Sequence, residues 1–139
     1  MAHKKKSWIE KRDQPATYEV KVVDKDFAGM KAGQLMLIAT PRIIDDYVRQ
    51  IPPGHLVDPK TMREDLALEY RAETTCPVTT GIFLRIVAEA AYEEYQQGKP
   101  KEEITPFWRA IAPKAKAADK LTFGKDLLLK MHAEEDIGN

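Results

Sequence analysis

Apolar residues near the start of the chain fall into two short runs that predict extended structure. Tyr18, Val20 and Val22 alternate with polar residues, a pattern that fits either an edge strand or an irregular segment. Farther along, five consecutive apolar residues, Leu35 to Ala39, are followed by Pro41. Such a run predicts a short buried strand or extended segment that the proline closes.

A helix is predicted to begin at this proline. Thr40 can cap the helix, and Pro41 suits the first helical position because its fixed backbone angle is already helical. Apolar residues then recur at helical spacing: Ile43, Ile44, Tyr47, Val48 and Ile51. The sequence "PPG" at 52–54 predicts the end of the helix.

A second, shorter helix is predicted after this break. Asp58 is a suitable cap and Pro59 again falls at the first helical position. Met62, Leu66 and Tyr70 lie along one face of that helix.

The longest helical pattern of the chain comes next. Thr79 or Thr80 is the predicted cap, and Gly98 the predicted stop. The predicted apolar face consists of Ile82, Phe83, Ile86, Val87, Ala90 and Ala91. Two helices joined by a short connection, the second beginning with small hydroxyl residues, resemble a helix-turn-helix whose second helix enters the DNA major groove.

The charges on this helix favour contact with DNA at one end only. Arg85 is the basic residue of its first turns, whereas Glu89, Glu93 and Glu94 gather toward the other end. Carboxylates repel phosphates, so only the N-terminal end can approach a nucleic acid. The alternative is a solvated amphipathic helix with an acidic outer face.

Composition narrows the classes of protein to consider. A chain of 139 residues, 43% hydrophobic and 32% charged, fits one soluble domain with a real core. Lys plus Arg and Asp plus Glu each number 22, so nucleic-acid binding requires a local basic patch. The basic start of the chain precedes no long apolar run, which predicts a cytoplasmic protein without a membrane span.

Residue types that often carry chemistry are sparse. The histidines His3, His55 and His132 have no metal-ligand spacing, so we expect no metal and no cofactor. The lone Cys76 is either a reactive thiol at a helix N-terminus or a small packing residue. The carboxylates of "REDLALE", "EEY" and "KEE" are expected to be solvated and to have no acid-base role.

From Ile51 to about Glu134, roughly three-fifths of the chain, the sequence resembles the DNA-binding domain of the alkylguanine-DNA alkyltransferases. Four motifs appear in that family's order: "IPPGHLV" for I-P-x-G-x-V, "RIVAEAA" for R-A-V-G-x-A, "ITPFWRAI" for V-P-C-H-R-V, and "GKDLLLKMHAEE" for G-x-x-x-K-x-x-L-L-x-x-E. The family repairs alkylated guanine by transferring the alkyl group to its own cysteine. The resemblance implies a DNA-binding helix-turn-helix.

The chain departs from the family where the chemistry takes place. Phe107 stands at the position of the acceptor cysteine and Trp108 at that of the histidine, and neither ring can act as a thiolate or a general base. Pro59, with Asp58 beside it, replaces the tyrosine that helps to flip the damaged base. The sequence therefore predicts a protein without alkyltransferase activity.

Two matching residues remain. Arg85 falls where the family inserts an arginine into the base stack, and Arg109 keeps the arginine of the cysteine motif. Alkyltransferase-like proteins, which carry tryptophan in place of the acceptor cysteine, bind alkylated DNA and recruit repair proteins. By this resemblance Phe107, Trp108 and Arg109 line a lesion pocket. Alternatively, the two rings pin the loop into the core, with the indole N–H bonded to a backbone carbonyl.

These patterns predict a mainly α fold: a small winged-helix-like or helix-turn-helix domain at 51–139, on which an N-terminal arm, short strand and helix at 1–50 pack. The predicted function is catalytically inactive binding of double-stranded DNA, alkylated DNA included, with a repair protein as a further partner. The expected DNA contacts are the Lys4 to Lys6 arm, Lys60, Arg63, Thr79, Thr80 and Arg85. The alternative is a protein-interaction or small-ligand module that no longer binds DNA.

Overall fold

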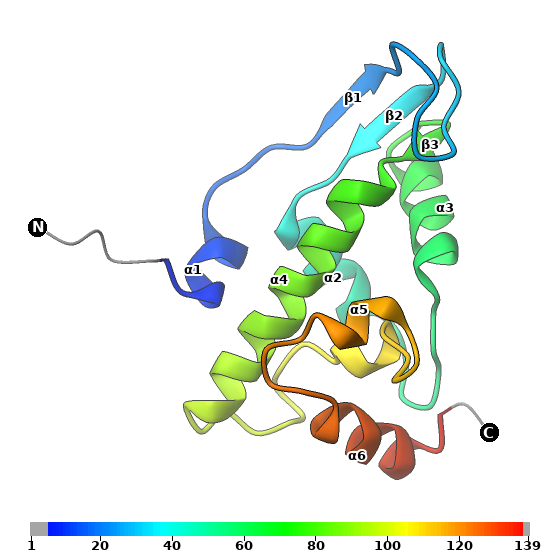
Figure 1. The fold of residues 1–139 in the computed structure, drawn as a ribbon. Coiled ribbons are helices and arrows are strands. Elements are labelled where there is room, and N and C mark those ends of the chain that lie inside the picture. The colour runs from blue at the N-terminus through cyan, green and yellow to red at the C-terminus, as the bar shows by residue number, and fades with distance from the viewer. Residues whose placement is uncertain (1–5, 138–139) are drawn as a thin grey trace, which may run out of the picture.

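Helix α4, Pro77–Gln96, runs through the middle of the molecule, and helices α1, α2 and α3 and the short helix η1 all contact it (Figure 1). The structure is a computed structural model and describes residues 6–137. The lysines at 4 and 5 in the predicted basic arm lie outside the described residues.

The described residues form mostly helices and one small sheet, which confirms the prediction of an α-rich fold. The elements other than α4 are α1 (Trp8–Asp13), β1 (Glu19–Val22), β2 (Leu35–Ile38), α2 (Pro41–Arg49), α3 (Pro59–Glu69), β3 (Thr74–Thr75), η1 (Phe107–Arg109), α5 (Lys116–Asp119) and α6 (Asp126–Glu135).

The sheet has three strands in the order β1-β2-β3. Strand β2 is the apolar run predicted from the sequence, and it pairs antiparallel with β1 and parallel with β3. The alternating run therefore forms an edge strand from Glu19 to Val22 rather than an irregular segment, and Tyr18 precedes the strand. Strand β3 has only two residues, too few for a hydrophobic pattern to predict.

Helices α2 and α3 begin where their caps predict. The Thr40 side chain accepts a hydrogen bond of 3.2 Å from the Ile43 N–H, and Asp58 Oδ1 accepts one of 2.8 Å from the Thr61 N–H. In both helices a proline occupies the first turn. These contacts satisfy N–H groups that a helix start leaves without intrahelical partners.

The predicted caps of α4 are wrong. The helix begins earlier, at Pro77, so that Thr79 and Thr80 lie inside its first turn. The Thr80 hydroxyl donates to the Cys76 carbonyl over 2.7 Å. The predicted stop at Gly98 is confirmed: the helix ends at Gln96, and Gly98 has a φ of +102°, which glycine adopts without strain.

The predicted apolar face of α4 is only partly right. Val87, Ala90 and Ala91 are buried, but Ile82 is 52% exposed. Leu84 and Ala88, which the prediction left out, are buried instead. Because this helix is apolar on more than one side, its spacing alone could not indicate which side faces the core.

The carboxylates of α4 are not a solvated outer face. Glu93 accepts hydrogen bonds from the backbone N–H groups of Trp8, at 2.9 Å, and Ile9, at 3.2 Å, and so stabilises the start of α1. Glu94 accepts a hydrogen bond of 2.6 Å from the buried Arg12 of α1. The acidic end of α4 thus holds the N-terminal helix.

Glu89 is buried more deeply, with 2% of its surface exposed. Its two carboxylate oxygens accept bonds from Thr122, one from the backbone N–H at 2.7 Å and one from the hydroxyl at 2.5 Å. A buried carboxylate requires such partners, since desolvation without them is costly.

The N-terminal fifty residues are joined to the rest of the chain on two sides. Strand β3, from the second segment, extends the sheet that β1 and β2 form, and α1 and α2 pack on α4. A second, smaller apolar cluster lies beside the sheet and consists of Val23, Met30, Met36 and Cys76. Nowhere in 6–137 does a helix combine the length and apolar character needed to cross a membrane.

Candidate nucleic-acid interface

One side of the first half of α4 is open to solvent and carries no carboxylate. Val78, Gly81 and Ile82 are exposed on this side, and Arg85 is half-buried one turn farther on. Their spacing of three and four residues places them along one face of the helix. We call this face the α4 stripe.

A groove of about 670 Å³ lies against the α4 stripe. Lys11 of α1, Arg85 of α4 and Lys120, directly after α5, supply three positive charges to its walls, and the described residues that line it include no carboxylate. Trp8 forms a further wall, with Lys11 Nζ 4.3 Å and Arg85 Cζ 5.3 Å from its ring centre. The groove is thus cationic and partly apolar.

Arg85 is the predicted DNA-contacting residue that lies in this groove. Its Nε atom is 3.8 Å from Glu89 Oε2, and its guanidinium lies near the face of Trp8. This Nε is buried and has no hydrogen-bond partner among the described residues. The side chain is therefore positioned by its packing on Trp8 and by the charge of Glu89.

Sequence reasoning missed Trp8, Lys11 and Lys120 as members of this site. The first two lie on α1, which the apolar pattern did not predict. Ser7 and Glu10 form a capping box, in which each side chain bonds the backbone N–H of the other. That four-residue signal could have predicted the start of α1.

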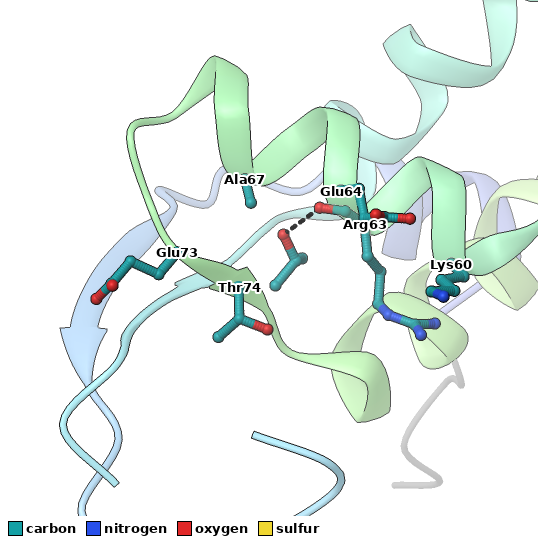
Figure 2. Close-up of a pocket in the computed structure, with 7 residues that line it drawn as sticks. Lys60, Arg63, Glu64, Ala67, Glu73 and Thr74 are labelled. Atoms are coloured by element: carbon teal, nitrogen blue, oxygen red, sulfur yellow. Dashed lines mark hydrogen bonds between the residues drawn. The ribbon is translucent and has the colours of Figure 1, made fainter. Parts of the chain in front are cut away.

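Lys60 and Arg63 lie on α3, at a separate pocket of about 210 Å³ between α3 and β3. Figure 2 shows the two cationic side chains next to each other, on the opposite side of the pocket from Glu73. Glu64 and Glu73 also line this pocket, so its charge is mixed. The structure therefore separates the predicted cations into a mixed-charge pocket at α3 and the cationic groove at α4.

The two threonines predicted to contact DNA differ in exposure. Thr79 is half-buried, and its hydroxyl lies 3.4 Å from the Cys76 carbonyl. Thr80 is buried and its hydroxyl is bonded to the same carbonyl. Thr80 cannot present its hydroxyl to a ligand in this conformation, and we leave it out of the interface proposed below.

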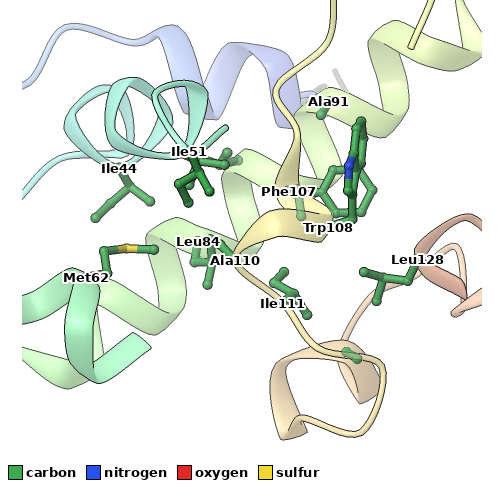
Figure 3. Packing of buried hydrophobic residues seen from close by; sticks show 14 of the residues in the cluster. Ile44, Ile51, Met62, Leu84, Ala91, Phe107, Trp108, Ala110, Ile111 and Leu128 are labelled. Carbon is green, nitrogen blue, oxygen red and sulfur yellow. The ribbon is translucent and has the colours of Figure 1, made fainter. Parts of the chain in front are cut away.

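The aromatic pair of the "PFWR" segment lies in the core. Phe107 is 0% exposed and Trp108 1%, and Figure 3 shows both rings within the buried cluster that also includes Ala91 and Leu128. The Phe107 ring meets that of Trp108 edge-on at 5.3 Å and that of Phe123 at 5.6 Å. These contacts favour the alternative in which the rings pin the loop, and no ring face is left open for a damaged base.

A carboxylate holds this turn in place. Glu135 of α6 accepts hydrogen bonds from Trp108 Nε1 at 2.8 Å, from Arg109 Nε at 2.9 Å and Nη2 at 2.8 Å, and from the Gly54 N–H at 3.0 Å. Arg109 Nη1 also donates to the Ile51 carbonyl over 2.9 Å. The prediction that the indole N–H bonds a backbone carbonyl is wrong, because its acceptor is a carboxylate 27 residues away.

These contacts change the acidity of Glu135. Burial by itself raises the pKa of a carboxyl group, but here the hydrogen bonds from Arg109, Gly54 and Trp108 outweigh it and lower the pKa to about 2. Glu135 is thus ionised at neutral pH, and Arg109 is committed to a structural ion pair rather than to an open pocket.

Cys76 belongs to the core as well. The residue precedes α4 and its side chain is buried within the smaller apolar cluster. A thiol reagent is therefore expected to modify Cys76 far more slowly in the folded protein than in urea, because the thiol is shielded. Timed labelling followed by mass spectrometry measures both rates. Equal rates would contradict a buried packing role.

Within residues 6–137, no group of three or more His, Cys, Asp or Glu side chains is placed to hold a metal ion. Comparison of the chain with models of protein families, with curated proteins and with solved structures finds no match. The resemblance to the alkyltransferases therefore depends on the four motifs alone, and it enters the proposal below only as support.

Proposed function

We propose that this protein binds double-stranded DNA through the α4 stripe and the groove beside it, without transferring a group to itself. The observation that carries the proposal is the charge of that surface. Although the chain has no net charge, three cations and no carboxylate line the groove within residues 6–137. Phosphate contacts from such a local patch supply most of the affinity of DNA-binding proteins.

The internal contacts of the acidic residues support this function. From the sequence, Glu89, Glu93 and Glu94 count against DNA binding because they share a helix with Arg85. In the structure Glu89 is bonded to Thr122, Glu93 to the start of α1, and Glu94 to Arg12. Glu93 and Glu94 are thus directed toward α1 and away from the α4 stripe, and Glu89 is buried beneath the stripe, where it lies 3.8 Å from Arg85 Nε.

The arrangement of α3 and α4 supports a helix-turn-helix, in which α4 is the recognition helix. The two helices are consecutive, and β3 lies in the connection between them. The small sheet beside α3 supports the winged-helix form of this fold, in which a sheet packs beside the helix-turn-helix. In this proposal Val78 and Ile82 contact base edges, for example thymine methyl groups, while the lysines contact phosphates.

A silent alkyltransferase-like protein is the form of this function that the motifs favour. The acceptor position of the family holds Phe107, and a buried phenyl ring provides no nucleophile. Preference for an alkylated base is a separate question, because the burial of Phe107 and Trp108 leaves no lesion pocket at that turn.

The test is fluorescence anisotropy of two labelled duplexes, one unmodified and one with a single methylguanine, at low and moderate salt. Lys120→Glu and Ile82→Glu are each expected to weaken binding about tenfold or more, and Lys120→Glu to reduce the salt dependence as well. Lys130→Glu, a change of the same charge on the exposed side of α6, serves as the control and is expected to have little effect. Circular dichroism confirms that each variant is folded.

The proposed interface would be overturned if the affinity for DNA did not change with salt concentration. It would also be overturned if Lys130→Glu weakened binding as much as Lys120→Glu. Equal affinity for the two duplexes would leave DNA binding intact but exclude lesion sensing. The absence of binding to either duplex would favour the alternative, a module for protein or small-ligand interaction. The exposed apolar side chains of Val78 and Ile82 in the groove are the observation that supports this second function.

A further inference from the structure

The outer edge of strand β1 carries backbone groups that face away from the sheet. In an antiparallel pair, alternate residues direct their N–H and C=O groups toward the neighbouring strand. Val23 N–H donates to the Gln34 carbonyl over 2.9 Å, which continues the register in which Lys21 faces Met36 and Glu19 faces Ile38. Residues 19, 21 and 23 therefore bond to β2.

The hydrogen bonds of β2 independently indicate which residues of β1 face outward. The carbonyls of Leu35 and Leu37 accept bonds from Glu73 and Cys76, on the β3 side, at 2.8 and 2.9 Å. Leu35 and Leu37 are the register partners of Val22 and Val20. The backbone groups of Val20 and Val22, and by the same alternation those of Tyr18, consequently point outward from the sheet.

This edge is also apolar and exposed. Tyr18, Val20 and Val22 are all exposed, Val22 to 55%, and Val20 and Val22 lie on the same face of the sheet as their register partners Leu37 and Leu35. Among the described residues no element lies beyond β1, as Figure 1 shows. An exposed edge with apolar side chains is a template on which a further strand can add.

The geometry points to a second copy of this chain as that strand: we propose that two molecules pair through β1, antiparallel, about a twofold axis at Val20. In this register Val20 exchanges two hydrogen bonds with Val20 of the second copy, and Tyr18 lies opposite Val22. All three residues direct their backbone groups outward, so the register uses the groups that β2 leaves unused.

The charges select this register over its neighbours. With the axis at Val20, Glu19 lies opposite Lys21 of the second copy, and the symmetry repeats this pair, so that two opposite-charge pairs form on one face. An axis at Lys21 would place two lysines opposite each other, and an axis at Glu19 two glutamates. The segment "YEVKV" is therefore complementary to itself in one antiparallel register.

Sedimentation equilibrium of the full chain over a range of concentrations tests this dimer. Wild-type protein is expected to show a reversible monomer–dimer equilibrium in the micromolar range. Glu19→Lys and Lys21→Glu are each expected to raise the dissociation constant about tenfold, because each change sets like charges opposite one another twice. The double variant restores both pairs and is expected to return to within about threefold of wild type.

Two further variants complete the test. Lys25→Glu makes the same charge change outside the paired segment and is expected to leave the equilibrium unchanged. Val20→Pro is expected to abolish the dimer and preserve the fold, since the N–H that proline removes faces away from β2. The proposal would be overturned if the wild-type chain stayed monomeric at all concentrations. It would also be overturned if the single charge changes did not weaken the dimer, or if the double change did not restore it.

Discussion

Replacing Phe107 with alanine is expected to lower the free energy of unfolding by about 4 kcal/mol, a large part of the stability of an ordinary small domain. The ring is fully buried and contacts Trp108 and Phe123, so its removal leaves a cavity where η1 meets the core. Urea denaturation followed by circular dichroism measures the change. Phe27→Ala, at an exposed phenylalanine of the β1–β2 hairpin, is the matched control and is expected to cost less than about 1 kcal/mol.

The same variant tests whether the aromatic pair has a binding role. If Phe107→Ala left stability unchanged and weakened DNA binding, the ring would line a ligand site and not pin the loop. Loss of stability with unchanged DNA affinity, measured where the variant is still folded, is the result that the buried geometry predicts.

Replacing Glu135 with alanine is expected to lower the free energy of unfolding by about 3 kcal/mol. The change leaves the largely buried Arg109 guanidinium and the Trp108 indole N–H without their acceptor. Glu134→Ala is an adjacent control: its carboxylate forms an exposed ion pair with Lys101, and solvent-exposed pairs contribute little to stability. Equal losses in the two variants would show that the Glu135 contacts add no more stability than an exposed ion pair.

The lowered pKa of Glu135 gives this prediction a pH dependence. Its pKa falls from 4.5 to about 2 on folding, so the folded protein favours the ionised form. The resulting stability is fully present above pH 4.5 and is lost as the pH falls toward 2. The difference in unfolding free energy between wild type and Glu135→Gln should therefore shrink over that range. A difference that stays constant down to pH 2 would contradict the assignment.

Local signals predicted those parts of the fold that local chemistry determines. Thr40 and Asp58 cap their helices as expected because the capping bond spans only three residues. Gly98 ends α4 because its backbone conformation favours glycine. The orientation of α4 was less predictable, since Ile82 and Leu84 are both apolar and only packing decides which one is buried.

The candidate site shows where sequence reasoning ends. Arg85 could be singled out from its place in a motif, but Trp8 and Lys120 reach the same groove from segments distant in the chain. Likewise the sequence predicts a solvated side chain for Glu93, whereas in the structure Glu93 bonds the start of α1. Long-range partners of this kind decide the charge of a surface, and no short sequence pattern records them.

Because α1 docks on α4 through Glu93 and Glu94, the fluorescence of its tryptophan reports on that contact, separately from the tryptophan of the core. The two tryptophans lie in unlike surroundings: Trp8 on α1, half-buried beside the groove, and Trp108 in the core. Detachment of α1 would change the emission of Trp8 alone, whereas global unfolding would change both. Single-tryptophan variants could therefore resolve release of the N-terminal helix from melting of the core, in one protein and with no added label.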